Sequence, residues 1–375
     1  MDKKRYMTLD ILKGIAMIMV ILVHYNQSFS NNIRLFSYCQ MGCQIFFVMS
    51  GLGVAFSLSS RFNHNRFVSQ LIPFYKSRLL RIAPAYYFMM IVVFFINTVL
   101  LVLTERTLSF GSNRSLIGII CNLLFIHGLV PTANNNVMPG GWYIGTTMLL
   151  YLIAPFFLFL LQKFPKRKRT ICALISVISI GTLFILSLLV PEQYKRFLTN
   201  NNSFGYFSIL TQLPCFALGM LLYFEIEEEK LGNPVANILT GIVILVLSVV
   251  LFFNPLFDFS YIFTVSIVGL ATFFLSKGLI CIEQKKDINC PFKFIITIGK
   301  KSLYVFLTHA FFTWPFVSVI KKLISLLGCS SDNYVVYFVL FPVVVVLSFF
   351  SGVLLEKVVA AIMRHLTKNM TAKTI

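Results

Sequence analysis

The first apolar run of the chain, TLDILKGIAMIMVILVHY (8–25), holds three ionisable residues whose spacing could support chemistry. At about 100° per residue in a helix, Lys13 and His24 lie within ~20° of one face, and Asp10 lies within about 40° of it. Charged groups inside an apolar helix are costly, which makes them functional candidates. We therefore predict His24 as a general base, with Lys13 ~16 Å away along the helix and oriented by Asp10. The alternative is that Lys13 anchors the helix end and His24 is a packing residue.

A second group of basic residues lies in RFVSQLIPFYKSRLLRIAP (66–84). Arg78 and Arg81 are three residues apart on a predicted helical turn, with Lys76 nearby. Two guanidinium groups on one face can bind phosphates bidentately, which favours an anionic ligand. The alternative is an anchor that contacts anionic lipid at the membrane surface.

Two further polar residues are found near the C-terminal end. His309 lies in IGKKSLYVFLTHAFF (298–312), ~12 Å beyond Lys301 by helical rise. It is a candidate catalytic residue or, alternatively, a hydrogen-bonded core histidine. Glu356 is followed directly by Lys357, so a substrate contact and an interfacial ion pair are both open.

A polar loop with two glycines (134–141) is flanked by His127 on one side and by Trp142 and Tyr143 on the other. Amide side chains and aromatic rings at the entrance of a helix could bind a sugar by hydrogen bonds and ring contact. His127, Trp142 and Tyr143 are therefore predicted to bind substrate, and a plain turn is the alternative.

These residues must be positioned by membrane-spanning helices. Of 375 residues 58% are hydrophobic and 12% charged, against about 25% charged in soluble domains, so a tethered soluble enzyme is excluded. We predict an all-α integral membrane protein that forms one domain over 1–375. The apolar runs predict ten spans: 8–29, 37–59, 83–104, 142–162, 171–190, 206–224, 234–254, 259–282, 295–320 and 334–362. The run 117–130 is too short to span and is predicted to be interfacial or re-entrant.

The net charge of +19 comes from short basic clusters between the apolar runs. This pattern is typical of cytoplasmic loops in polytopic proteins and excludes nucleic acid as a partner. With an inside N-terminus, 24 of the 32 Lys and Arg fall on the side of both termini and 7 on the other, which predicts cytoplasmic termini. The eight cysteines form no C-x-x-C pair, so no disulfide or metal framework is predicted.

Several stretches, taken in order, resemble acyltransferase family 3, a family of polytopic membrane proteins. The resemblance begins with the basic residue, ten intervening residues and histidine of 8–25. It continues through QIFFVMSGLGVAFSL (44–58), RLLRIAPAYY (78–87), LLFIHGL (123–129), NNNVMPGGWYIGTTMLLYLIAP (134–155), LPCFALGMLL (213–222) and IGKKSLYVFLTH (298–309) with Glu356. Thr147 stands where a Glu is common in the family, and the sequence leaves open what this change means for the acid/base or orienting role of that position.

The resemblance implies transfer of an acyl group, usually acetyl, from cytoplasmic acyl-CoA to a hydroxyl of a cell-envelope or lipid-linked carbohydrate. Acyl-CoA is then a co-substrate, with no tightly bound cofactor and no metal, and the protein resides in a cell membrane, most simply a bacterial inner membrane, in contact with its lipids. The site expected on this basis has His24, Asp10 and His309 as catalytic residues, Lys13, Lys76, Arg78 and Arg81 at the CoA end, and His127, Trp142, Tyr143 and Glu356 near the acceptor.

A transporter or flippase of lipid-linked saccharides is the rival class, because it would also contain intramembrane charges. Such proteins often carry paired repeats with broken helices, and the sequence shows no repeat. A transporter leaves CoA untouched, whereas an acyltransferase consumes the thioester. The acceptor, the acyl chain and the oligomeric state are left open by the sequence.

Overall fold

The structure is a computed structural model that describes residues 6–59, 67–104, 115–135, 137–199, 203–256, 260–285 and 293–372. Within these ranges all regular elements are helices, so the predicted all-α fold is confirmed. Their bounds are α1 Met7–Asn26, η1 Arg34–Met41, α2 Gly42–Ser59, α3 Phe67–Thr104, α4 Leu116–Leu123, η3 His127–Leu129, α5 Gly141–Lys163, η4 Pro165–Arg167, α6 Lys168–Leu189, α7 Glu192–Thr199, α8 Phe204–Phe207, α9 Ile209–Glu227, α10 Pro234–Phe253, α11 Ser260–Lys285, α12 Lys293–Lys300, α13 Ser302–Thr308, η5 Phe312–Phe316, α14 Val317–Leu326 and α15 Tyr334–Ala372.

The described part of the chain has 9 helices long and apolar enough to cross a membrane, or 10 if the bent pair of Ser302–Thr308 and Phe312–Leu326 is one span. This agrees with the predicted set of spans and makes the protein a multi-pass membrane protein. The predicted non-spanning run 117–130 forms the eight-residue α4 and the short turn η3. At ~1.5 Å per residue, α4 is far too short to cross.

Two predicted boundaries are wrong. The segment 67–82, expected as a connection, is the first part of α3, which continues through Pro73 and Pro84. The helix predicted at 295–320 is broken instead: α13 and the segment Phe312–Leu326 meet at 51° across residues 309–311, directly before the π-helical turn η5, which contains Pro315. Proline removes a backbone donor and π-turns interrupt helical hydrogen bonding, so a bend here has a local cause.

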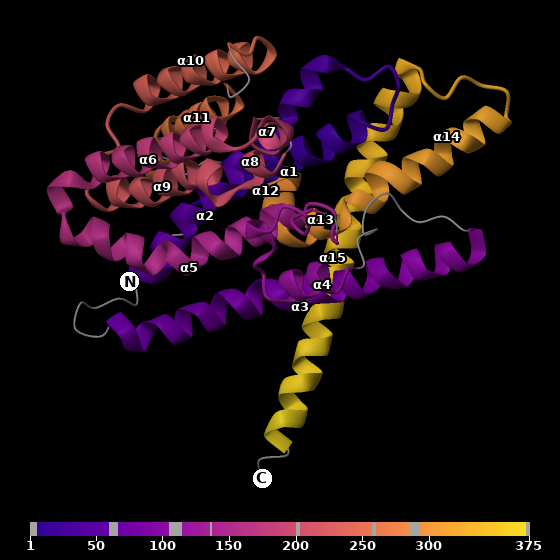
Figure 1. Ribbon diagram of the computed structural model, residues 1–375, viewed down its shortest axis with the longest axis horizontal. Helices are drawn as coiled ribbons and strands as arrows, with labels where there is room; N and C mark the ends of the chain where they lie inside the picture. Colours follow the sequence, from indigo (N-terminus) through magenta and orange to yellow (C-terminus); the bar gives the residue numbers. More distant parts are fainter. Residues whose placement is uncertain are drawn as a thin grey trace.

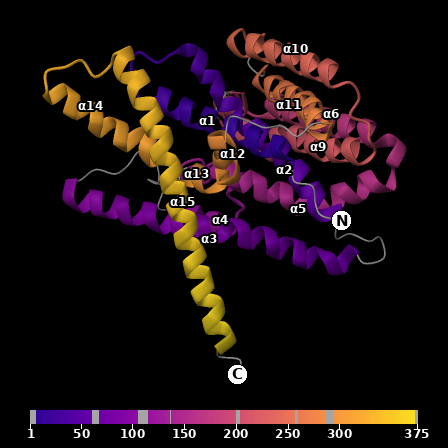
Figure 2. The ribbon, with the colours of Figure 1, turned by 180° about the vertical axis from the view of Figure 1, so that it is seen from behind.

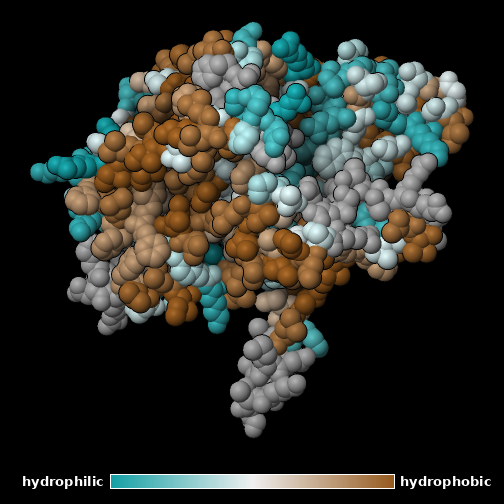
Figure 3. Space-filling view, in the orientation of Figure 1, coloured by the Kyte–Doolittle hydropathy of each residue, from teal (hydrophilic) through white to brown (hydrophobic). Residues whose placement is uncertain are grey.

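Most of the long helices lie side by side, and α15 crosses them at a steep angle (Figure 1). The view from behind shows the same crossing of α15 over α3, with α10 and α11 paired at the far edge (Figure 2). Apolar residues cover much of the face over α5 and α6, and hydrophilic residues gather toward the end where α14 lies (Figure 3). An apolar belt with a polar end is the surface that a bilayer requires.

The position of α1 is fixed at its first turn by a carboxylate from another helix. Glu283 of α11 accepts hydrogen bonds from the backbone N–H groups of Met7, at 2.5 Å, and Thr8, at 2.9 Å, and from the Thr8 hydroxyl at 2.7 Å. These bonds satisfy donors that have no partner within the helix, and the negative charge favours the helix N-terminus. At Gly299 an added Cβ would overlap the backbone carbonyl oxygen of Asp10, so α1 and α12 pack backbone to backbone.

Candidate active site

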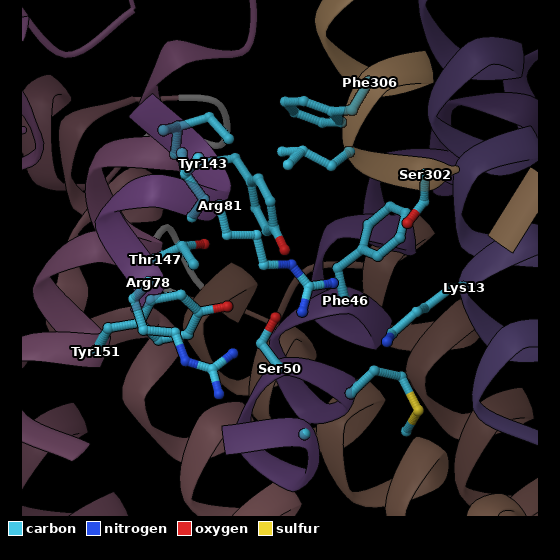
Figure 4. Close-up of a pocket in the computed structure, with 15 residues that line it drawn as sticks. Lys13, Phe46, Ser50, Arg78, Arg81, Tyr143, Thr147, Tyr151, Ser302 and Phe306 are labelled. Atoms are coloured by element: carbon cyan, nitrogen blue, oxygen red, sulfur yellow. The ribbon is translucent and has the colours of Figure 1, made fainter. Parts of the chain in front are cut away.

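A cavity of about 110 Å³ lies where α1, α2, α3, α5 and α13 meet (Figure 4). Three cationic side chains line it: Lys13 from α1 and both Arg78 and Arg81 from α3. Its polar lining is completed by hydroxyl-bearing residues, namely Ser50, Tyr143, Thr147, Tyr151 and Ser302. No carboxylate is found among the described lining residues, so the cavity, which we call the cation pocket, is suited to an anion.

Arg78 is held in place by aromatic rings. The residue is 8% exposed, and its guanidinium lies 5.3 Å from the centroid of Phe74 and 5.4 Å from that of Tyr151. Stacking of this kind fixes the position of the guanidinium in the wall of the cavity. Figure 4 shows Arg81 and Lys13 reaching toward the same space from opposite sides.

The two membrane histidines form a second cluster outside the lining of the cation pocket. The ring centroids of His24 and His309 are 5.3 Å apart, and Trp314 of η5 contacts His24 edge to face at 4.9 Å. Phe306 links the two regions: its ring lines the cation pocket and lies 5.5 Å from His309 and 5.0 Å from Tyr143. The bend before η5 thus brings the two imidazoles and Trp314 together. The Phe306 ring lies between this cluster and the cations of the pocket.

The hydrogen bonds of the histidines determine which nitrogen can act as a base. His309 is 1% exposed, and its Nδ1 lies 2.6 Å from the carbonyl oxygen of Phe306. A carbonyl only accepts, so Nδ1 carries the proton and Nε2 carries the lone pair. In the described structure Nε2 of His309 has no hydrogen-bond partner. His24 is half-buried, and its Nδ1 faces Oε1 of Gln27 at 3.4 Å, which leaves Nε2 as its acceptor too.

Comparison with known proteins identifies the family. Residues 8–356 match the family described as an acyltransferase domain. The chain belongs to acyltransferase family 3. Over 231 residues it is 27% identical to the O-acetyltransferase OatA of Staphylococcus aureus (strain NCTC 8325 / PS 47), covering 60% of this chain and 35% of that protein. Over 129 residues it is 35% identical to the Regulator of hypoxia-inducible factor 1 of Caenorhabditis elegans, covering 34% of this chain and 24% of that one.

The matched regions therefore span about a quarter to a third of these curated relatives. No solved structure matches the chain.

Within the acyltransferase, the departure at Thr147 falls in the cation pocket. Thr147 and Ser50 flank the hydroxyl of Tyr143, and all three line the cavity. A Glu at this position would add a carboxylate to the lining of the cavity that Arg78 and Arg81 share. Its replacement leaves a neutral hydroxyl and a more positive pocket.

Other residues predicted from the sequence lie elsewhere. Lys76 does not line the cation pocket but a groove on the outer side of α3 and α5. Asp10 is buried near the start of α1 against α12 and is not part of the cavity lining. Glu356 of α15 forms its ion pair with Lys301, which lies in the turn between α12 and α13. The adjacent Lys357, expected as its partner in the interfacial alternative, is not the partner observed.

The residues predicted around the polar loop are mostly covered. His127 is fully buried, with Nε2 2.8 Å from the carbonyl oxygen of Gly141 and its ring stacked at 4° on Tyr86. Trp142 is buried against Phe207, with ring centroids 4.6 Å apart. Among these residues Tyr143 alone lines the cation pocket. Asn136 of this loop lies outside the described residues.

Three residues near the site were not singled out by the sequence: Phe306, Tyr151 and Trp314. Helical spacing carried a usable signal for two of them. Phe306 precedes the predicted site residue His309 by three residues, and Tyr151 follows Thr147, the position of the family Glu, by four, so each lies on one helix face with its neighbour. Trp314 is brought to His24 by the bend at η5, which has only Pro315 as its sequence signal.

Proposed function

We propose that this protein is a membrane-bound O-acyltransferase that moves an acyl group, most simply acetyl, from acyl-CoA to a hydroxyl of a carbohydrate. One observation carries the proposal: in a chain of acyltransferase family 3, Phe306 separates a pocket of three cations from a pair of imidazoles. The cations suit the phosphates of the donor, and the imidazoles suit proton transfer at the acceptor. The relative named O-acetyltransferase supports acetyl transfer to oxygen.

The donor end of the reaction falls to Lys13, Arg78 and Arg81. These three cations would neutralise most of the roughly four negative charges of CoA by charge-assisted hydrogen bonds. The excess of basic residues on the side of the termini supports a cytoplasmic location of this end in the cell membrane. The flexible arm of CoA would then extend from the pocket past Phe306 toward the histidines. Acyl-CoA is a co-substrate in this scheme, and neither a resident cofactor nor a metal is part of it.

The chemical step needs a base for the acceptor hydroxyl. We assign this role to Nε2 of His24, because half-buried His24 can be reached by a substrate, whereas His309 is buried. The hydroxyl proton passes to Nε2, and the oxygen attacks the thioester carbonyl carbon. The carbon–sulfur bond then breaks, and the proton returns to the leaving CoA thiolate. His309, fixed by the Phe306 carbonyl, orients His24 from the side.

The acceptor is proposed to be a carbohydrate because the family resemblance favours one. Tyr143 is retained as a substrate contact, since its hydroxyl faces the pocket. His127, Trp142 and Glu356 are not assigned to the acceptor, because the first two are buried in packing contacts and the third is paired with Lys301.

The test compares His24→Asn with His309→Asn in purified protein, using acetyl-CoA as the probe. General-base catalysis contributes about 10²–10⁴ in rate, so we expect His24→Asn to lower acetyl transfer per folded molecule by that factor and to retain CoA affinity. Release of CoA is followed by chromatography, because the eight cysteines of the chain would react with thiol reagents. Transfer is followed as O-acetyl groups on carbohydrate from cells that express each variant.

Near-normal turnover of folded His24→Asn would overturn the general-base assignment, and a large loss in His309→Asn alone would move the role to His309. A protein that binds no CoA and releases none from acetyl-CoA, while it moves lipid-linked saccharide across vesicles, would overturn the proposed function in favour of the transporter class.

A further inference from the structure

Two apolar grooves of nearly equal size open on the sides of the helix bundle. One, of about 420 Å³, lies between α3 and α5 beside the turn that follows α4; we call it the α3–α5 groove. The other, of about 410 Å³, lies between α5, α6 and α9; we call it the α5–α6 groove. Both volumes fall within the range of small-molecule sites.

The α3–α5 groove opens on the outer surface of the helix bundle and not into its interior. Its rim residues Ile72, Leu79, Leu124, Ile126 and Leu152 are all exposed apolar side chains. Most of these lie on helices that are long and apolar enough to span a membrane. A hydrocarbon chain can therefore enter this groove sideways from the bilayer.

Charge distinguishes the two grooves. The α3–α5 groove has Lys76 and Arg78 in its lining, whereas the described lining of the α5–α6 groove contains no charged residue. Lys76 is exposed, and no ion pair of Lys76 is found in the described part of the chain. An apolar groove that carries a cation is complementary to a lipid, in which an acyl chain is joined to a phosphate.

The α3–α5 groove also shares a wall with the cation pocket. Arg78 and Tyr151 belong to both linings, and the guanidinium of Arg78 stacks on the Tyr151 ring. A chain that packs in the groove would support this stack from its outer side. The α5–α6 groove has no residue in common with the cation pocket.

We propose that the α3–α5 groove binds one anionic glycerophospholipid, with an acyl chain against its apolar wall and the headgroup phosphate at Lys76. This inference depends on the groove and its charge and not on the proposed reaction. The α5–α6 groove, which lacks a cation, takes lipid chains without preference for the headgroup.

The experiment measures lipid retained by the purified full chain, without CoA, by native mass spectrometry. The probes are phosphatidylglycerol and phosphatidylcholine with identical chains. We expect wild-type protein to retain one phosphatidylglycerol in preference to phosphatidylcholine. Lys76→Gln should weaken the phosphatidylglycerol affinity about fivefold, the factor that corresponds to ~1 kcal/mol per cation, and Lys76→Arg should preserve it. Leu152→Trp, which fills the groove, should abolish the selective binding.

Two matched variants make the result specific. Lys163→Gln removes another exposed lysine, at the end of α5 and outside the groove, and Ile178→Trp fills the α5–α6 groove. Both should retain the preference for phosphatidylglycerol. If Lys163→Gln weakened the phosphatidylglycerol affinity as much as Lys76→Gln, the preference would come from the overall surface charge, and the proposal would be overturned. Full competition by glycerol phosphate would show a headgroup site without a chain, and dimers that dissociate with Leu152→Trp would show a second copy in the groove; either result would overturn it.

The lipid measurement uses no CoA, so its result does not depend on whether the proposed acyl transfer is correct. The converse also holds: if lipid selectivity is absent and His24→Asn still abolishes transfer, the groove proposal alone is wrong.

Discussion

The cation pocket and the cluster around Glu225 differ in the groups that surround their cations. At Glu225 the carboxylate accepts hydrogen bonds from Arg169 at 2.7 and 2.9 Å and from the Lys277 ammonium at 2.9 Å. The cation pocket has comparably buried Arg78, but its described lining contains hydroxyl groups and aromatic rings and no carboxylate. The Glu225 cluster holds its own counter-charge, whereas the described lining of the cation pocket presents three cations to the cavity and suits an anionic ligand.

The two clusters also differ in the helices that they join. Glu225 of α9 connects α6, through Arg169, and α11, through Lys277. Lys13, Arg78 and Arg81 come from α1 and α3, the helices that bring the first histidine and the groove to the site. Substitutions that separate stability from ligand affinity therefore test this contrast directly.

The largest expected effect is on stability, at Glu225. Glu225→Gln leaves the ammonium of Lys277 buried without its counter-charge, because the Glu225 side chain is 5% exposed and that of Lys277 9%. Loss of one partner of a buried pair costs about 3–5 kcal/mol. We expect a markedly lower midpoint of thermal unfolding in detergent and unchanged CoA affinity per folded molecule. An unchanged unfolding midpoint in Glu225→Gln would show that the ion pairs of this cluster do not stabilise the fold.

The next effect is on affinity, at Arg81. Arg81 is exposed toward the cavity, so Arg81→Ala should leave folding nearly unchanged. Loss of a charge-assisted hydrogen bond costs about 1.5–3 kcal/mol, or roughly ten- to a hundredfold in CoA affinity by calorimetry. Arg78→Ala should weaken CoA binding similarly but also remove the stack on Phe74 and Tyr151. Wild-type affinity in Arg81→Ala would mean that Arg81 is an anchor for lipid.

Comparison of sequence and structure shows which parts of this site local patterns can predict. Hydrophobicity located the spans, because a bilayer imposes length and composition on each helix. It missed the start of α3, because 67–82 is rich in basic residues and yet helical. Helical periodicity placed Lys13 and His24 on one stripe, and Lys13 does line the cavity, but His24 packs instead with His309 and Trp314.

The remaining errors concern tertiary packing. The glycines before Trp142 indicated a helix entrance, but nothing local showed that Phe207, more than sixty residues later, would cover the Trp142 ring. Similarly, the neighbour of Glu356 in sequence was a reasonable ion-pair partner, and the fold supplied Lys301 from the turn between α12 and α13. Contacts between distant segments are decided by how the helices pack, which no local pattern encodes.

A smaller effect is expected at Glu228, near the Glu225 cluster, as a dependence on pH. Hydrogen bonds from Lys168 and Lys230 hold the pKa of Glu228 below its ordinary value. The carboxylate therefore contributes stability above the unfolded-state pKa of about 4.3, and this contribution is lost as pH falls through the lower folded-state pKa. Glu228→Gln should lower stability at pH 7 by ~1 kcal/mol and reduce the acid sensitivity of unfolding. If the wild-type protein and Glu228→Gln unfold with the same acid sensitivity, other carboxylates cause that sensitivity.

The smallest effect is expected at Arg169, which provides the closest match to Arg81. Both are exposed arginines at the edge of a charged cluster, but the Arg169 side chain is 70% exposed and already paired with Glu225. Exposed ion pairs contribute about 0.2–1 kcal/mol, and Lys277 continues to neutralise Glu225 when Arg169 is lost. Arg169→Ala should therefore lower stability by no more than ~1 kcal/mol and leave CoA affinity unchanged. If Arg169→Ala and Arg81→Ala reduced CoA affinity equally, the effect of each would be one of net charge, and the distinction between a self-neutralised cluster and a ligand pocket would fail. A loss confined to Arg81→Ala would locate the anion in the cation pocket, because the two variants remove the same charge and differ only in where it was held.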